Sequence, residues 1–276
     1  MRGRRRAPLS GTCVRLGLFI AVIFPGAGTA ALAGASVHPA ARDAPAHLAT
    51  VAHRSVRSYP FVYVAIGASD SYGVGTDDPA TESWPAVLAR HLPPGTHFVN
   101  LGVPGTLLHR AVEVELPVAL DTHPTLVTVW LAVNDLAAGV PLPRYRHDLD
   151  TLLGALRRMT HARVLIADVP DLALLPAFAG HPGLAPVVAA WNAAIAAAAR
   201  AHGAILVDVY ARWRDLALHP EYVGPDGLHP TAEGYRRLAE LFWRVYRASR
   251  PPRAGAVRYP WPPIVGGQDA PCLEQA

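Results

Sequence analysis

The chain has 276 residues, 51% of them hydrophobic, which suffices for one or two domains with a substantial core. Its formal net charge is +4, and every one of its 25 basic residues is an arginine. Five of these arginines, and no acidic residue, lie within the first 33 positions, so the remainder has a net charge of −1. A nearly neutral body argues against nucleic acid as a partner.

The first 33 residues have the composition of an export signal. A basic segment at residues 2–6 precedes an apolar run at residues 16–24, and Ala31-Leu32-Ala33 fits a cleavage site of small residues. We therefore expect a signal peptide over residues 1–33 and a secreted, extracellular protein. The alternative is an uncleaved membrane anchor, because the uncharged run 16–34 is just long enough to span a bilayer. Contact with a membrane is expected only through this segment.

The chain after the leader divides into a linker, one domain and a tail. Residues 34–58 are rich in Ala, His and Pro without clear periodicity, which is typical of a linker. Residues 59–249 alternate five times between apolar β-rich runs and helical patterns, and residues 250–276 form a proline-rich tail. This alternation predicts an α/β fold, a three-layer α/β/α sandwich with a five-stranded parallel sheet.

The first predicted strand, residues 61–66, is continuously apolar, as expected of a strand buried on both faces of a parallel sheet. The helix predicted next, at residues 81–92, contains Pro85 in its first turns. Pro117 should end or kink the helix predicted at residues 106–120. The remaining elements are strands at 97–101, 125–133, 163–167 and 204–207, helices at 144–159, 187–202 and 230–248, and irregular segments at 168–186 and 208–227.

Small polar side chains and glycines follow several of the predicted strands. Ser69 comes after the first strand, Gly105 after the second and Asn134 after the third, while His229 lies just before the last helix. Because the carboxyl ends of parallel strands meet at one edge of the sheet, residues distant in sequence can come together there. Taken alone, the stretch around Ser69 also fits an ordinary turn.

These residue types match the requirements of acyl transfer. A serine hydroxyl is a weak nucleophile until a base such as neutral histidine removes its proton, and the histidine needs a carboxylate on its other nitrogen. Asp226 lies three residues before His229, and a glycine between them allows a tight bend. Asn134 and the backbone N–H groups of Ser69 and Gly105 are candidates for an oxyanion hole.

Four short blocks, each at the end of a predicted strand or before the last helix, carry a shared pattern. They are Gly67-Ala68-Ser69-Asp70-Ser71-Tyr72-Gly73, Asn100-Leu101-Gly102-Val103-Pro104-Gly105, Ala132-Val133-Asn134-Asp135 and Asp226-Gly227-Leu228-His229-Pro230. In this order they resemble the SGNH-hydrolase superfamily, the GDSL-type esterases and lipases. The resemblance covers roughly residues 59–249, essentially the whole predicted domain.

The resemblance implies a flavodoxin-like SGNH fold and assigns roles by register. Ser69 would be the nucleophile, His229 the base and then the acid, and Asp226 the carboxylate that orients His229. The N–H groups of Ser69 and Gly105 and the side chain of Asn134 would form the oxyanion hole. The resemblance implies no metal and no other cofactor.

Two positions depart from the family pattern. Ala68 stands where the first block has aspartate, and Ala132 where the third block has glycine. Neither position carries a triad or oxyanion role. Ala68 does remove a side chain that would help to shape the nucleophile loop, and Asp70 is a candidate to compensate. The register of the first block selects Ser69 over Ser71.

Other interpretations are less well supported. The α/β-hydrolase fold requires Gly-x-Ser-x-Gly, whereas Ser71 occupies the last of these positions here. The 13 histidines are scattered and form no His-Glu-x-x-His motif, so most should be surface or packing residues rather than metal ligands. Asp208 is expected to cap the turn after it, Asn192 to lie on a helix surface, and Trp130 and Trp191 to pack in the core.

We therefore expect a secreted serine esterase that hydrolyses carboxylic esters of small molecules, lipids or acetylated glycans. Residues 168–181 should lie on the catalytic side of the sheet and are candidates for an acyl pocket. The alternative enzyme is an O-acetyl esterase acting on a carbohydrate or cell-wall polymer. An alternative of another class is a non-catalytic extracellular binding module that uses the same cleft.

Overall fold

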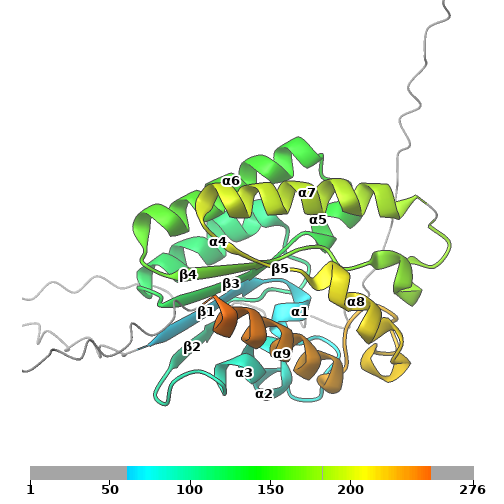
Figure 1. The fold of residues 1–276 in the computed structure, drawn as a ribbon, viewed down its shortest axis with the longest axis horizontal. Coiled ribbons are helices and arrows are strands. Elements are labelled where there is room, and N and C mark those ends of the chain that lie inside the picture. The colour runs from blue at the N-terminus through cyan, green and yellow to red at the C-terminus, as the bar shows by residue number, and fades with distance from the viewer. Residues whose placement is uncertain (1–60, 182, 250–276) are drawn as a thin grey trace, which may run out of the picture.

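The computed structural model describes residues 61–181 and 183–249 (Figure 1). The expected signal peptide, linker and proline-rich tail lie outside these residues. Five strands form one parallel sheet in the order β2-β1-β3-β4-β5, which confirms the predicted sheet. The strands are β1 (Val62–Gly67), β2 (His97–Asn100), β3 (Leu126–Trp130), β4 (Arg163–Ala167) and β5 (Ile205–Val207).

Helices cover both faces of the sheet, as the three-layer prediction requires (Figure 1). One layer contains α4 (Leu108–Asp121), α6 (Leu142–Met159) and α7 (Leu184–His202), and the other contains α3 (Trp84–Ala89) and α9 (Ala232–Ala248). The shorter elements are α1 (Ser69–Tyr72), α2 (Pro79–Glu82), α5 (Val133–Ala137), α8 (Val209–Ala217) and the 3₁₀ turns η1 (Leu172–Leu174), η2 (Pro176–Phe178) and η3 (Pro220–Tyr222).

Apolar side chains fill the space between the sheet and both helical layers. All six residues of β1 are buried, as expected of a strand covered on both sides. On one face Trp84 stacks on Phe242 with ring centroids 4.1 Å apart, and Trp130 packs edge-on against Trp84. On the other face Tyr145 and Trp191 lie 4.4 Å apart. Trp130 and Trp191 are therefore core residues, as predicted.

Helix α7 is, within the described part of the chain, the one helix long and apolar enough to cross a membrane by length and composition. In this fold it packs on α6 and buries Val188, Trp191 and Ile195. The buried face of α7 thus packs against the rest of the domain.

Proline explains two differences from the predicted helices. The helix expected at 81–92 is split at Ser83 into α2 and α3, because Pro85 lacks an N–H for a continuing helix but suits the first turn of a new one. Helix α4, by contrast, continues through Pro117 to Asp121. Pro117 was expected to end or kink the helix; it does not end it, and the kink stays a prediction.

The segment expected to be irregular at 208–227 contains α8. Two carboxylates satisfy the first N–H groups of this helix: Asp168 Oδ1 accepts from Val209 and Tyr210 at 2.8 and 2.9 Å, and Asp208 Oδ1 accepts from Ala211 at 2.8 Å. The expected capping by Asp208 is confirmed. Asp168 comes from the end of β4, and such a tertiary contact is not visible in the local sequence pattern.

Candidate active site

Ser69, His229 and Asp226 form a continuous chain of hydrogen bonds at the carboxyl edge of the sheet. Ser69 is the first residue of α1, directly after β1, and its Oγ lies 2.8 Å from His229 Nε2. His229 Nδ1 lies 2.5 Å from Asp226 Oδ2. Ser71 instead is fully buried, and its Oγ has no hydrogen-bond partner among the described residues. The geometry thus places Ser69, not Ser71, beside the histidine.

A tight turn holds Asp226 and His229 together. Asp226 Oδ1 accepts hydrogen bonds from the N–H groups of Leu228 at 2.9 Å and His229 at 3.0 Å. Gly227 has a φ of +69°, a left-handed conformation that favours glycine. The N–H of Gly224 donates to the carbonyl of His229 at 2.7 Å and closes the turn. The carboxylate is therefore held in place before any substrate binds.

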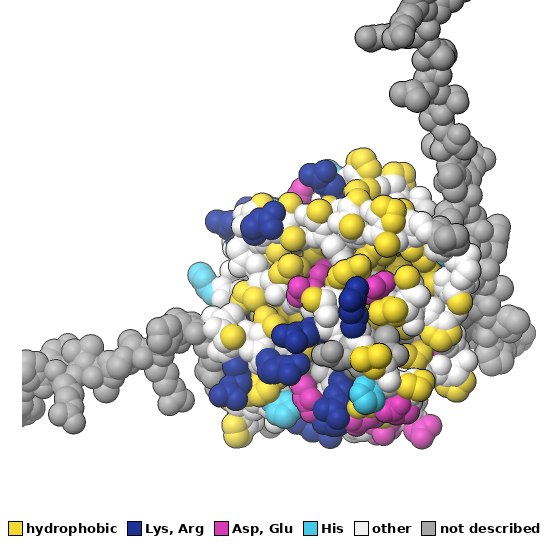
Figure 2. Space-filling model, turned by 45° about the vertical axis from the view of Figure 1, so that its right-hand side comes forward, with side chains coloured by type: hydrophobic (Ala, Val, Ile, Leu, Met, Phe, Trp, Pro, Cys, Tyr) yellow, Lys and Arg dark blue, Asp and Glu magenta, His cyan; other side chains and the backbone are white. Residues whose placement is uncertain are grey.

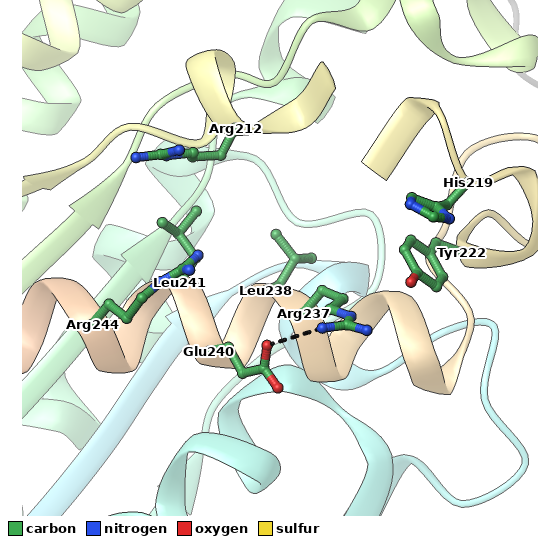
Figure 3. Close-up of a pocket in the computed structure, with 8 residues that line it drawn as sticks. All are labelled: Arg212, His219, Tyr222, Arg237, Leu238, Glu240, Leu241 and Arg244. Carbon is green, nitrogen blue, oxygen red and sulfur yellow. Dashed lines mark hydrogen bonds and ion pairs between the residues drawn. The ribbon is translucent and has the colours of Figure 1, made fainter. Parts of the chain in front are cut away.

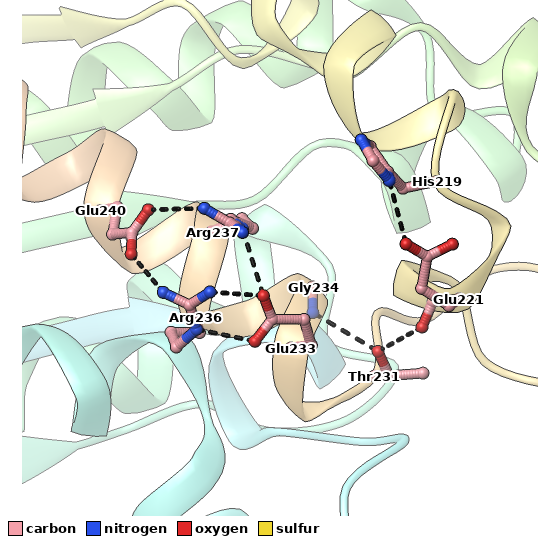
Figure 4. Close-up of polar contacts among 8 residues, drawn as sticks. All are labelled: His219, Glu221, Thr231, Glu233, Gly234, Arg236, Arg237 and Glu240. Carbon is pink, nitrogen blue, oxygen red and sulfur yellow. Dashed lines mark hydrogen bonds and ion pairs between the residues drawn. The ribbon is translucent and has the colours of Figure 1, made fainter.

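Polar contacts join η3 to the start of α9, on either side of this turn (Figure 4). Thr231 Oγ1 donates to the carbonyl oxygen of Glu221 at 2.9 Å and accepts from the N–H of Gly234 at 3.4 Å. One turn later, Arg236 bridges Glu233 and Glu240. The contacts of Thr231 thus close the segment between η3 and α9 that contains His229.

Three hydrogen bonds support the loop that carries Ser69. The N–H of Gly67 donates to Glu115 Oε2 at 2.9 Å, and Asn100 Nδ2 donates to the carbonyl of Ser71 at 2.7 Å. Asn100 Oδ1 in turn accepts from the N–H of Gly102 at 3.1 Å. The end of β1, the turn α1 and the loop after β2 are thus joined behind the nucleophile candidate.

Asn134 faces the same cavity as Ser69 and His229. One N–H of its amide donates to the carbonyl of Thr106 at 3.0 Å, and the amide carries a second N–H. Gly105, just before Thr106, has a φ of +78° but does not line the cavity. The structure therefore brings Ser69, Asn134 and His229 together directly, with Gly105 in the adjoining loop.

Asp135 holds the start of α4, directly after the loop that contains Gly105 and Thr106. Its carboxylate is 1% exposed, and both oxygens accept from the N–H of Leu108 at 3.1 Å at the start of α4. The substituted family position nearby, Ala132, has a φ of 177°, outside the left-handed region that favours glycine.

The carboxyl groups around the site differ in the direction in which their pKa values are shifted. Partial burial acts against ionisation of Asp226, but hydrogen bonds from the His229 ring and two backbone N–H groups outweigh it, so the pKa of Asp226 lies below its usual value. Burial raises the pKa of Asp70 to about 6 and that of Asp135 to about 6. Asp226 is thus the carboxylate best suited to stay ionised beside His229.

The cavity at Ser69 is small. It measures about 20 Å³, and a neighbouring cavity of about 10 Å³ lies against Pro170, Leu172 and Leu175 of the segment after β4. This agrees with the expectation that residues 168–181 border the site. Among the described residues, no cluster of His, Cys, Asp and Glu is arranged to hold a metal ion.

Larger hollows lie elsewhere on the domain. One of about 330 Å³ lies between α8, η3 and α9 and is bordered by Arg212, Arg237 and Arg244 (Figure 3). On the face drawn in Figure 2, charged side chains gather along the lower part, with apolar side chains above them. The hollow of about 330 Å³ shares no lining residue with the cavity at Ser69. Its lining residues include no nucleophile paired with a base.

Two inward-facing residues were not anticipated. Glu115 lies on the helical stripe formed with Leu108, Ala111 and Ala119, and that spacing is a signal that it faces the core. Asn192 was expected on a helix surface, but its amide donates to the carbonyl of Val169 at 2.9 Å and accepts from its N–H at 2.8 Å. Asn192 therefore fixes the backbone where the segment after β4 leaves the sheet.

Comparison with known proteins agrees with this arrangement. Residues 65–237 match the model of the GDSL-like Lipase/Acylhydrolase family. A comparison with curated protein sequences gives no match.

Solved structures share the fold at low sequence identity. The lipase/acylhydrolase from Enterococcus faecalis is 18% identical with a TM-score of 0.55, and the alignment covers 68% of this chain and 96% of that one. The esterase EstA from Pseudoalteromonas sp. is 18% identical with a TM-score of 0.55, covering 68% and 97%. The acetylxylan esterase Axe2 from Geobacillus stearothermophilus is 16% identical with a TM-score of 0.57, covering 67% and 94%. Because the family model spans more than half of its residues, the chain belongs to the GDSL-like lipase/acylhydrolase family and is a hydrolase of ester bonds.

Proposed function

We propose that the chain is a secreted serine esterase in which Ser69, His229 and Asp226 form the catalytic triad. The observation that carries this proposal is the pair of hydrogen bonds through His229, 2.8 Å to Ser69 Oγ and 2.5 Å to Asp226 Oδ2. Both distances lie within the reach required for proton transfer and for orientation of the imidazole.

In the proposed reaction, Ser69 Oγ attacks the ester carbonyl while its proton passes to His229 Nε2. The N–H groups of Ser69 and Gly105 and the amide of Asn134 receive the negative charge on the former carbonyl oxygen. Asp226 accepts from His229 Nδ1–H and stabilises the imidazolium.

Collapse of the tetrahedral intermediate breaks the bond to the alcohol, which leaves with the proton held by His229. A water molecule then attacks the acyl group on Ser69 and gives a proton to His229. The second collapse releases the carboxylic acid and returns the proton to Ser69 Oγ. These steps need no metal, so treatment with EDTA should leave the activity unchanged.

The size of the cavity favours a short acyl group. About 20 Å³ beside Ser69 accommodates few atoms, whereas pockets for larger ligands usually enclose roughly 300–1,000 Å³. This observation supports a second candidate substrate class, O-acetyl groups on a carbohydrate or cell-wall polymer. The similarity to an acetylxylan esterase is compatible with that class.

Hydrolysis of a series of p-nitrophenyl esters from C2 to C12, beside acetylated sugars, tests the proposal on purified protein. We expect the highest kcat/KM on the shortest esters and a loss of activity in Ser69→Ala. A wild-type rate equal to that of Ser69→Ala on every ester would leave the non-catalytic binding module as the function.

The proposed secretion rests on the arginine-rich leader and on Ala31-Leu32-Ala33. N-terminal sequencing of protein from the culture medium should find a start near Gly34. Full-length protein retained in the membrane fraction would instead favour the uncleaved anchor.

A further inference from the structure

Asp70 directly follows the proposed nucleophile and borders two adjoining cavities. The first contains Ser69, Asn134 and His229, and the second is the smaller apolar cavity. Asp70 and Trp130 line both, so the second cavity extends the first past the Asp70 side chain. Asp70 lines the cavity at Ser69 itself, so a substrate group beside the reacting carbonyl would lie close to its carboxylate.

The carboxylate of Asp70 has no hydrogen-bond or ion-pair partner in residues 61–181 and 183–249. The titratable groups that interact electrostatically with Asp70 are His229, Asp226 and Tyr235. Burial raises the pKa of Asp70 to about 6, while the charge of His229 lowers it and that of Asp226 raises it. At neutral pH, Asp70 is thus a half-buried anion without a partner among the described residues. The approach of a cation stabilises such a carboxylate, because it lowers the free energy of the ionised form.

The walls around Asp70 also suit a cation. Apart from His229, no basic side chain lines either cavity, and Trp130 lines the cavity at Ser69. Indole rings attract ammonium groups through their negative faces, and more strongly where water is excluded. A negatively charged substrate group beside Asp70 would be repelled by its carboxylate.

We propose that Asp70 gives this esterase a preference for substrates that carry an ammonium group close to the scissile ester. The proposal rests on the proposed function, since it concerns the same site. Asp70 is a specificity residue in this scheme, because it contacts the bound substrate but takes no part in bond making. The ammonium group can belong to the acyl or to the alcohol side of the ester.

Matched esters that differ only in charge test this preference. On the alcohol side, acetylcholine is compared with its neutral isostere 3,3-dimethylbutyl acetate. On the acyl side, the ethyl ester of trimethylglycine is compared with ethyl 3,3-dimethylbutanoate. The quantity measured is the ratio of kcat/KM for the cationic ester to that for the neutral one, which cancels changes in general catalytic efficiency.

Asp70→Asn keeps the shape of the side chain and removes its charge. We expect the ratio to fall by about tenfold or more in at least one pair, as expected for losing an opposite charge a few ångströms away in a partly dry site. The pair that responds identifies the side of the ester that carries the cation. Glu113→Gln, which removes an exposed acid on α4, should leave both ratios unchanged.

The pH dependence gives a second test that needs no variant. Quaternary ammonium groups do not titrate, so in the wild type the ratio should rise between pH 5 and pH 7 as Asp70 loses its proton. The rise should be absent in Asp70→Asn, which retains His229, Asp226 and Tyr235. If Asp70→Asn does not fold, the wild-type profile decides.

Ratios that are the same in wild type and Asp70→Asn, or flat with pH in the wild type, would overturn the preference alone if the neutral esters are still hydrolysed. Failure of the wild type to hydrolyse any of the four esters faster than Ser69→Ala would overturn the proposed function together with the preference.

Discussion

Glu115 is a buried carboxyl group on α4 whose ionisation should cost the fold part of its stability. The residue is 3% exposed, and burial raises its pKa from 4.5 to about 8, although the hydrogen bond from Gly67 acts in the opposite direction. In the unfolded chain the carboxyl group loses its proton near pH 4.5. Between pH 4.5 and about pH 8, folding therefore requires uptake of a proton. Each pH unit in this window removes about 1.4 kcal/mol of stability. The wild type should lose about 2.7 kcal/mol between pH 5 and pH 7 through this residue.

Glu115→Gln removes the titration and keeps an oxygen for the N–H of Gly67. The free energy of unfolding of the variant minus that of the wild type should increase by about 2–3 kcal/mol from pH 5 to pH 7. Urea unfolding followed by tryptophan fluorescence measures this shift. The control is Glu113→Gln, on the exposed face of the same helix, which should change stability by less than about 1 kcal/mol. A variant–wild-type difference that stays constant from pH 5 to pH 7 would refute the reasoning.

Other substitutions probe the site and its supporting loop. Ser69→Ala and His229→Ala should each lower kcat by several orders of magnitude, and the double variant should be little worse, because nucleophile and base act as a unit. Asn134→Ala should lower kcat on the order of 10²–10³-fold, the usual loss for one oxyanion donor, and an unchanged kcat would contradict its role. Gly67→Ala should destabilise the fold by about 1–3 kcal/mol in thermal or urea unfolding. A Cβ at that position would lie 2.0 Å from Ser71 Oγ, so Ser71→Gly should restore part of the loss.

The sheet and the four blocks could be predicted because their signals are local. The strand at 61–66 is apolar on both faces, and the blocks at Ser69, Asn134 and His229 are short segments with fixed spacing. Once the strands are parallel, their carboxyl ends must converge, and the structure brings these three residues to one cavity.

The differences arise where tertiary contacts override the local pattern. Helix α8 depends on Asp168, which lies 41 residues away from Val209 in sequence and still satisfies its N–H. Asn192 turns inward because the backbone of Val169 offers both a donor and an acceptor. Glu115 could have been recognised, since an acid on a buried helical stripe needs a specific partner, here the N–H of Gly67.

Covalent labelling of Ser69 tests the proposed triad most directly. A fluorophosphonate probe should react with one serine of the purified protein, and peptide mapping by mass spectrometry should locate it at Ser69. Ser71→Ala should still be labelled, whereas folded Ser69→Ala and His229→Ala should not. Labelling at Ser71, or equal labelling of wild type and His229→Ala, would contradict the assignment of Ser69 as a nucleophile activated by His229.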